Sequence, residues 1–231
     1  MIRKARTGEF FVIDGDNWIS RWAEESGQLS HDQNALPIIL KHIKPGMTVV
    51  DGGAHIGSHT LAYCKAVGPT GRVYAIEPSQ EAFEALIANC PDAVCIKAAL
   101  SDRCALGAGR LVKSEDGNSG ASHVRDVVAA NEIPCCGDVD LLTLDSLDLH
   151  PDFIKLDLEG FELKALAGAW KTVQIFKPVM VVEINENALR RNGTDSQHLM
   201  RYIREFGYAL SNLYPRQEMA GDQWDCLCLP I

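Results

Sequence analysis

Short apolar runs alternate along this chain with segments whose apolar residues recur every three or four positions. Five runs have the length of buried strands, at 48–50, 72–76, 93–97, 153–157 and 179–184. Four segments have helical spacing, at 34–43, 58–66, 79–90 and 161–170. The apolar residues repeat with a different period in strands and in helices, which distinguishes the two kinds of segment. Strands that alternate with helices predict an α/β fold with a mostly parallel, doubly wound sheet and helices on both faces.

The alternation is interrupted once and changes near the C-terminus. Residues 103–146 carry several glycines and a polar turn, which predicts a β-hairpin-like insertion. Further on, a helix is expected to begin near Asp195, where a side chain suited to capping precedes an apolar stripe. The segments 208–213 and 224–229 then predict a final antiparallel pair of strands.

At 231 residues, the chain has the size of one domain. We expect residues 34–231 to form the main domain and residues 1–33 an N-terminal extension or cap. The net charge is −9 without a long basic run, which argues against nucleic acid and anionic membranes as partners. The apolar runs are too short for a signal peptide or a membrane span, so we predict a cytoplasmic protein.

Eight cysteines are scattered through apolar segments, and none of them forms a C-x-x-C pair. Cysteines in this setting are usually reduced core residues. We therefore expect neither a disulfide framework nor a metal site among them.

A glycine-rich turn follows the first predicted strand of the main domain. Asp51 ends that strand, and Gly53 and Gly57 then lead into a helix whose first N–H groups face the turn. A second acid, Glu77, ends the next strand. A turn that cradles part of a nucleoside, with an acid one strand over for ribose hydroxyls, is typical of a nucleotide-type site.

The spacing of this turn indicates which nucleotide it binds. A dinucleotide fingerprint, G-x-G-x-x-G, started at Gly52 meets Gly57 but has Ala54 where the backbone must approach a pyrophosphate. A nicotinamide-dependent oxidoreductase is therefore disfavoured. The pattern that fits is acid-x-G-x-x-x-G, formed by Asp51, Gly53 and Gly57, which suits a cationic ligand without a pyrophosphate.

Charged residues also gather at the end of the fourth predicted strand. Lys155, Asp157 and Glu159 share one of its faces by strand alternation. Glu183 and Asn185 repeat the pattern on the fifth strand. Because buried charges are costly unless paired, we expect Lys155 to pair with Glu183 if the two strands are neighbours. Ligands bind at the carboxyl ends of parallel strands, so we expect Asp157 to face the glycine-rich turn.

With these segments placed, the chain resembles the FkbM-like family of methyltransferases. The resemblance runs from about Pro45 to Asn185 and rests on the order and spacing of the blocks 50–57 (VDGGAHIG), 76–78 (IEP), 98–102 (AALSD), 118–122 (NSGAS), 142–147 (LTLDSL), 154–162 (IKLDLEGFE) and 182–185 (VEIN). His55 stands where many relatives have Asn. The resemblance implies a class I Rossmann-like fold and methyl transfer from S-adenosyl-L-methionine, in this family mostly to hydroxyl oxygens.

The same resemblance implies roles for individual residues. The implied cofactor-binding residues are Asp51, Gly53, Ala54, His55 and Ser58 around the methionine part, Glu77 with Pro78 and Ser79 at the ribose, and Leu100, Ser101 and Asp102 beside the adenine. Asp157 is a further implied cofactor-binding residue and would face the methyl-transfer centre. The expected acceptor is a small molecule or a carbohydrate.

Methyl transfer to a neutral hydroxyl requires a group that takes up its proton. Asp157, Glu159 and His123 are our candidates, and His31 stays open because carboxylates near a sulfonium have low pKa values. We expect a metal-free site, with metal activation through Asp157, Glu159 and Asn185 as the alternative. A non-catalytic adenosylmethionine-binding partner domain is the other interpretation, and the acids at the strand ends count against it.

Overall fold

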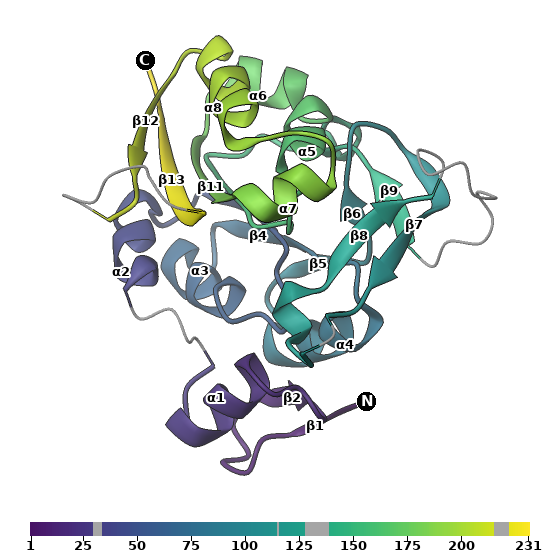
Figure 1. Ribbon diagram of the computed structural model, residues 1–231. Helices are drawn as coiled ribbons and strands as arrows, with labels where there is room; N and C mark the ends of the chain where they lie inside the picture. Colours follow the sequence, from purple (N-terminus) through teal and green to yellow (C-terminus); the bar gives the residue numbers. More distant parts are fainter. Residues whose placement is uncertain (30–33, 115, 128–138, 215–221) are drawn as a thin grey trace.

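The computed structural model describes residues 1–29, 34–114, 116–127, 139–214 and 222–231 (Figure 1). The strands are β1 (Ile2–Lys4), β2 (Phe11–Ile13), β3 (Thr48–Gly52), β4 (Arg72–Ile76), β5 (Val94–Ile96), β6 (Ala99–Leu100), β7 (Ala105–Val112), β8 (His123–Asp126), β9 (Val139–Leu142), β10 (Phe153–Leu156), β11 (Val179–Asn185), β12 (Tyr208–Asn212) and β13 (Gln223–Pro230). The helices are α1 (Ile19–Ser26), α2 (Ala35–Ile39), α3 (Thr60–Val67), α4 (Gln80–Asn89), α5 (Glu162–Ala167), α6 (Trp170–Phe176), α7 (Glu186–Arg191) and α8 (Ser196–Glu205). None of these helices is long and apolar enough to cross a membrane.

The central sheet has seven strands among the described residues, in the order β12-β13-β11-β10-β3-β4-β5. From β11 to β5 all neighbours are parallel, while β13 runs antiparallel to both β11 and β12. The chain moves from β3 outwards to β5 and later returns to β10 on the other side of β3. These relations confirm the predicted mostly parallel sheet and its antiparallel C-terminal strand.

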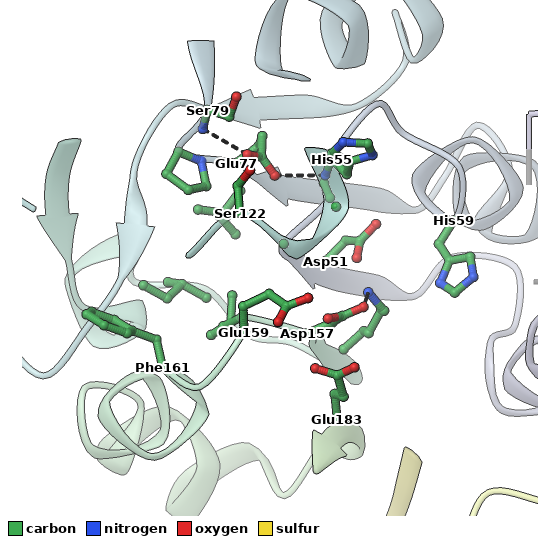
Figure 2. A pocket seen from close by; sticks show the side chains of 18 of the residues that line it. Asp51, His55, His59, Glu77, Ser79, Ser122, Asp157, Glu159, Phe161 and Glu183 are labelled. Atoms are coloured by element: carbon green, nitrogen blue, oxygen red, sulfur yellow. Dashed lines mark hydrogen bonds and ion pairs between the residues drawn. The ribbon is translucent and has the colours of Figure 1, made fainter. Parts of the chain in front are cut away.

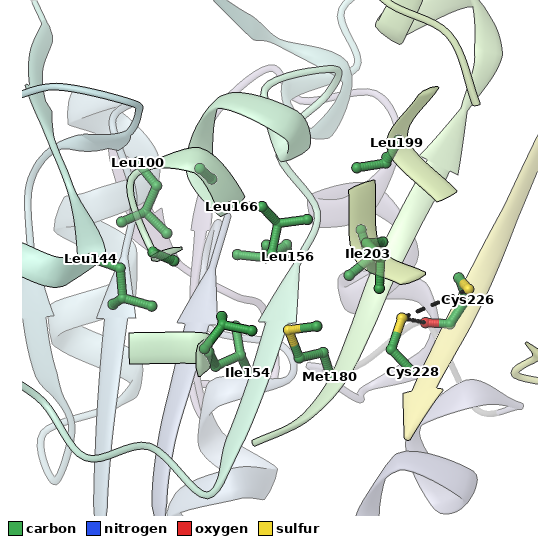
Figure 3. Close-up of a cluster of buried hydrophobic side chains, with 14 of the residues drawn as sticks. Leu100, Leu144, Ile154, Leu156, Leu166, Met180, Leu199, Ile203, Cys226 and Cys228 are labelled. Atoms are coloured by element: carbon green, nitrogen blue, oxygen red, sulfur yellow. Dashed lines mark hydrogen bonds between the residues drawn. The ribbon is translucent and has the colours of Figure 1, made fainter. Parts of the chain in front are cut away.

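Alternate residues of the central strands enter two apolar cores, one on each face of the sheet. On β3, Val49 packs in the cluster built with α2 and α3, and Val50 packs in the cluster built with α5, α6 and α8. Phe153 and Ile154 of β10 divide in the same way. In Figure 3, Ile203 of α8 lies among the strand side chains of the second cluster. Strands covered on both faces have continuous apolar sequences, which explains why the pattern located them.

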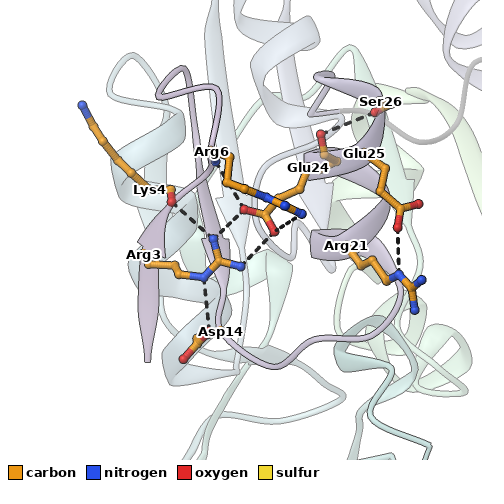
Figure 4. A network of polar contacts seen from close by, with 9 residues as sticks. Arg3, Lys4, Arg6, Asp14, Arg21, Glu24, Glu25 and Ser26 are labelled. Atoms are coloured by element: carbon orange, nitrogen blue, oxygen red, sulfur yellow. Dashed lines mark hydrogen bonds and ion pairs between the residues drawn. The ribbon is translucent and has the colours of Figure 1, made fainter.

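The N-terminal residues form a small unit in which the β1–β2 ribbon lies beside α1. Arg3 reaches from β1 to α1, where its Nη2 donates to Glu24 Oε2 at 2.8 Å (Figure 4). One buried cluster joins Val12 of β2, Ala23 of α1 and Ala85 of α4. The unit therefore packs directly on a helix of the main domain.

The segment between β5 and β10 builds a second sheet, in the order β6-β9-β7-β8. β7 and β8 pair antiparallel, from Gly109 opposite Asp126 to Val112 opposite His123. This pairing confirms the predicted hairpin-like insertion. Leu111 of β7 lines the cavity that also contains Asp51 and Glu77, so the second sheet contributes to that cavity.

One predicted helix is divided in two. The spacing over 161–170 predicts a single helix, but the structure has α5 and then α6. Between them, Gly168 passes so close to Ser101 that an added Cβ would lie 2.0 Å from the Ser101 carbonyl oxygen. Asp145 then caps α6, because its Oδ1 accepts the backbone N–H of Thr172 at 2.9 Å. The short helix α7 has no counterpart among the predicted elements.

Candidate functional site

A cavity of about 260 Å³ lies at the C-terminal ends of β3, β4 and β10 (Figure 2). These ends flank the point where the strand order reverses, which is where open α/β sheets bind ligands. The glycine-rich turn after β3 forms one wall, and the turn after β10 lies opposite. The predicted site residues that line the cavity are Asp51, Gly53, Ala54, His55, Ser58, Glu77, Pro78, Ser79, Leu100, Asp157 and Glu159.

Asp51 is fully buried at the end of β3. The hydroxyl of Thr60, in the first turn of α3, donates to its Oδ2 at 2.6 Å. Its Oδ1 has no hydrogen-bond partner among the described residues. Burial raises the pKa of Asp51, and the ammonium of Lys155 acts in the opposite direction. A buried acceptor without a donor is costly, so this oxygen suits a ligand that brings donors or positive charge.

Glu77 follows β4 and closes the turn from the other side. Its Oε2 accepts the backbone N–H of His55 at 2.9 Å, and its Oε1 accepts that of Ser79 at 2.8 Å (Figure 2). The side chain is nearly buried, and burial raises the pKa of Glu77 to about 7. Each carboxylate oxygen can accept more than one hydrogen bond, so Glu77 retains capacity for hydroxyl groups of a ligand.

The glycine-rich turn depends on an unusual backbone path. Gly53 has φ 77°, and an added Cβ would lie 1.8 Å from the carbonyl oxygen of Asp157. Only glycine fits there. His55 has φ 50°, in the left-handed region that Asn, Asp and His enter more readily than other side chains. The backbone at this position therefore favours His or Asn over most other non-glycine residues.

The N-terminal unit and the insertion meet beside this turn. His55 Nε2 and Ser119 Oγ are hydrogen-bonded at 2.8 Å. The backbone N–H of Ser119 donates to Asp16 Oδ1 at 3.0 Å, and the N–H of Ser20 donates to Asp16 Oδ2 at 2.6 Å. Ile19, from the start of α1, lines the cavity. Three segments that are distant in the sequence therefore form one side of the site.

The expected ion pair between Lys155 and Glu183 is replaced by a pair within the β10 segment, so that prediction is wrong. Lys155 Nζ lies 3.0 Å from Asp157 Oδ2, because residues two apart on a strand share a face. Glu183 instead accepts the side-chain amide of Gln223 on β13, at 2.7 Å. Burial by itself lowers the pKa of Lys155, but Asp157 and Asp51 together raise it above its ordinary value. Burial favours a higher pKa for Asp157, and Lys155 outweighs this and lowers it.

The turn after β10 holds Glu159 in an uncommon backbone conformation. Glu159 has φ 53° and Gly160 has φ 103°. The fully buried Glu162 anchors this turn, because its Oε1 accepts the N–H groups of Leu158 at 2.7 Å and Gly160 at 3.2 Å. Such backbone strain in a non-glycine residue gathers at functional sites. Burial, with the charges of Asp157 and Glu162, raises the pKa of Glu159 to about 7.

Three predicted site residues lie away from the cavity wall. Ser101 is fully buried, its hydroxyl donates to Asp102 at 3.2 Å, and neither residue is among those that line the cavity. His123 lines an adjoining groove of about 620 Å³, which shares Glu159 with the cavity. His31 lies outside the described residues. The assigned roles of all four stay predictions.

Several cavity residues had no ligand-binding role in the sequence-based site. They include Ile19, His59, Ser119, Ser122, Val124, Phe161, Glu183 and Gln223. The sequence contained evidence that could have identified three of these residues as site residues. Glu183 is an acid on a predicted strand, and Ser119 and Ser122 belong to one of the sequence blocks of the family resemblance. Ile19 and Gln223 line the cavity because the N-terminal and C-terminal segments pack beside it. Local sequence patterns do not predict such packing.

Comparison with known proteins identifies a protein family that this chain matches. The model of the methyltransferase FkbM domain matches residues 51–210. The ribosomal RNA large subunit methyltransferase E of Nitrosomonas europaea is 37% identical to this chain over 81 residues, which cover 33% of this chain and 39% of that protein. The match therefore spans well under half of this curated relative.

Two solved structures share the architecture. The methyltransferase FkbM of Methylobacillus flagellatus has a TM-score of 0.51 at 20% identity, over 79% of this chain and 43% of that chain. A TehB-like SAM-dependent methyltransferase of Corynebacterium glutamicum has a TM-score of 0.54 at 10% identity, over 94% of this chain and 98% of that chain. At these identities, the likeness shows the class I methyltransferase fold.

The family match spans more than half of the chain and contains Asp51, Glu77 and Asp157, three of the acids that line the cavity. The fold and the family confirm the cofactor that the resemblance implied, S-adenosyl-L-methionine. The chain belongs to the FkbM family of S-adenosylmethionine-dependent methyltransferases.

Proposed function

We propose that this methyltransferase acts on a hydroxyl oxygen of a small molecule or a carbohydrate. The observation that carries the proposal is the convergence of Asp51, Glu77 and Asp157 on one cavity. That cavity adjoins a groove through the shared residues Glu159 and Gln223. A cofactor in the cavity and an acceptor in the groove would therefore meet beside these carboxylates.

The residues of the cavity fit the chemistry of the cofactor. The buried Asp51 Oδ1 suits the cationic end of adenosylmethionine, since it has no donor among the described residues. Glu77 offers acceptor oxygens for the ribose hydroxyls. Ile76 and Leu100 provide an apolar surface for the adenine. When bound, the cofactor supplies an electrophilic methyl group.

The chain itself has to orient the acceptor and take up its proton. Orientation supplies most of the acceleration in a displacement of this kind. Asp157 and Glu159 on the cavity wall and His123 in the groove are the proton acceptors that we propose. Burial, together with the charges of Arg191 and Arg125, lowers the pKa of His123 and favours its neutral, proton-accepting form.

The lining of the groove favours a small, hydroxyl-rich acceptor. Among its residues, Ser114, Asn185, Asn187 and Gln223 offer both donors and acceptors to a polyhydroxyl ligand. The net charge of −9 opposes a phosphate-rich polymer. RNA is nevertheless the second candidate acceptor, because the relative from Nitrosomonas europaea is named for ribosomal RNA.

A domain that only binds the cofactor is less well supported than an enzyme. Binding the cofactor would not require a cluster of acids on the wall opposite the glycine-rich turn. Asp157, Glu159 and Glu183 form such a cluster. We therefore favour catalysis over a non-catalytic partner domain.

The test combines binding and turnover. Calorimetric titration with S-adenosylhomocysteine should show binding, and NAD as the control should show none. Transfer of a labelled methyl group is then measured on a panel of carbohydrates, small hydroxylated compounds and ribosomal RNA. We expect transfer to a member of the first two groups, and Asp157→Asn should retain binding but lose turnover. Transfer to RNA alone would replace the proposed acceptor class, and failure to bind S-adenosylhomocysteine would contradict the site.

A further inference from the structure

Three carboxylates, two from the segment that follows β10 and one from β11, converge on the cavity. One oxygen from each of Asp157, Glu159 and Glu183 lies within 4.8 Å of the other two. Figure 2 shows the three side chains turned toward a common space. Oxygen ligands on opposite sides of one ion are about 4.2 Å apart around Mg²⁺ and about 5 Å apart around Ca²⁺, twice the metal–oxygen distance. The three oxygens therefore lie close to the spacing that the coordination sphere of a single ion requires.

Glu183 indicates independently that a ligand belongs between these side chains. Only 7% of the residue is exposed. The amide of Gln223 donates to Oε1 at 2.7 Å, which sets the orientation of the carboxylate. Its Oε2 is buried and has no hydrogen-bond partner within the described part of the chain. A buried carboxylate oxygen in this condition is costly, and a cation in the common space would satisfy it.

The local charge matches a divalent cation. The three carboxylates bring three negative charges when ionised. Lys155 Nζ, 3.0 Å from Asp157 Oδ2, compensates one of them. Two negative charges remain, and all the available ligand atoms are hard carboxylate oxygens, which suit Mg²⁺, Mn²⁺ and Ca²⁺ rather than softer metals.

The backbone prepares Glu159 for this role. Its φ of 53° turns the chain back at the end of β10, and Glu162 fixes the turn through the N–H groups of Leu158 and Gly160. An added Cβ at Gly160 would lie 2.3 Å from the carbonyl oxygen of Ala188, so α7 presses on the same turn. A ligand held in this way needs little reorganisation when an ion binds.

We propose that Asp157, Glu159 and Glu183 bind one divalent cation, such as Mg²⁺ or Mn²⁺, which holds the acceptor hydroxyl. This inference rests on the proposed methyl transfer and deepens it. Three protein ligands leave coordination positions open, and a metal-bound hydroxyl releases its proton more readily. His123 in the adjoining groove would then take up that proton. Compared with the metal alternative drawn from the sequence, Glu183 takes the place of Asn185.

The test is a titration of the full chain with Mn²⁺, followed by the electron paramagnetic resonance signal of the free ion. We expect one site per chain, from which Mg²⁺ displaces Mn²⁺. Glu183→Gln should weaken Mn²⁺ binding at least tenfold, because it removes the charge from a buried ligand. Glu84→Gln, which changes an exposed carboxyl on α4, is the matched control and should leave the affinity unchanged.

Two results would overturn the inference: an undiminished free-ion signal at millimolar Mn²⁺, or the same affinity in Glu183→Gln as in the unaltered chain. If Glu183→Gln does not fold, Asp157→Asn takes its place with the same expected loss. Titration with S-adenosylhomocysteine separates this proposal from the proposed function. Binding of that compound without Mn²⁺ binding would remove the metal site alone, whereas Mn²⁺ binding without it would contradict the methyltransferase site alone.

Discussion

Gly53 and Asp157 come into backbone contact across two neighbouring strands. A Cβ added to Gly53 would lie 1.8 Å from the carbonyl oxygen of Asp157. β3 and β10 pair in parallel, so the turn after one strand lies directly beside the residue that follows the other. The cofactor turn and the proposed reaction centre are therefore joined through the main chain, and a change in one displaces the other.

Gly53→Ala should destabilise the protein and weaken cofactor binding. Backbone strain at a positive φ and the collision with Asp157 together cost at least about 2 kcal/mol. Gly193→Ala is the matched control, because Gly193 has a similar φ of 76° and nothing within 4 Å of an added Cβ. Urea denaturation measures the loss of stability in each variant. Equal losses in the two variants would contradict the close contact.

Asp51→Ala should abolish binding of S-adenosylhomocysteine while the chain stays folded. The buried carboxylate is the group that we expect to face the cationic end of the cofactor. Thr60→Val is the matched control, because it removes the donor to Oδ2 and keeps the carboxylate. It should weaken binding far less. Calorimetry measures the affinity and circular dichroism checks the fold; unchanged affinity in Asp51→Ala would place the cofactor elsewhere.

Cofactor binding should become tighter as the pH rises through about 7. Burial raises the pKa of Glu77 from 4.5 to about 7, and the ionised carboxylate is the better acceptor for ribose hydroxyls. The stability of the free protein against unfolding should depend on pH in the opposite direction. Because the folded chain holds this proton more tightly, the contribution of Glu77 to stability is complete below pH 4.5 and is lost as the pH rises through about 7.

Calorimetric titrations with S-adenosylhomocysteine between pH 5.5 and 8.5, a range of about 1.5 units on either side of 7, measure this dependence. Below pH 7, the affinity should fall by up to about tenfold per unit. Glu77→Gln, which has no proton to lose, should bind weakly with a flat profile. A sloping profile in that variant would assign the titration to another group.

Asp16→Ala should weaken cofactor binding although Asp16 is not among the residues that line the cavity. Its carboxylate accepts the backbone N–H of Ser119, whose hydroxyl contacts His55 in the glycine-rich turn. Loss of these charge-assisted hydrogen bonds should cost about 2 kcal/mol of stability. Chemical denaturation and titration with S-adenosylhomocysteine measure the two effects.

The control for this variant is Asp14→Ala. Asp14 has an exposed side chain and pairs with Arg3 at 3.2 Å, so its removal should cost less than about 1 kcal/mol. Although burial acts in the other direction, hydrogen bonds from Ser119 and Ser20 hold the pKa of Asp16 below its ordinary value of 3.8. The stabilisation by Asp16 is therefore present above that pH and is lost at lower pH. Equal effects of the two substitutions would contradict the proposed link.

The main strands could be predicted because each is buried on both faces. β3, β4, β10 and β11 are largely apolar, and the structure places them within a residue or two of the predicted runs. Local chemistry also located α4, since Ser79 accepts the N–H of Ala82 at its first turn. Parallel strands end at the same edge of a sheet, so Asp51, Glu77 and Asp157 could be recognised together as site residues.

Charge partners could not be predicted in the same way. The choice of Lys155 between Asp157 and Glu183 depended on Gln223, which the antiparallel strand β13 brings to Glu183. The division of the helix after β10 likewise depended on Gly168 meeting the chain at Ser101. Neither contact belongs to a repeating pattern.

The sequence by itself determined the order of strands and helices and the acids at the strand ends, because periodicity and strand direction act locally. Only the tertiary structure decided how the site is enclosed. The hydrogen bonds from Asp16 to Ser119 and from Ser119 to His55 join an extension, an insertion and the central turn. They form because packing of the two sheets and the N-terminal unit brings these segments together. Because the segments are far apart in the sequence, no repeating pattern of residues predicts that packing.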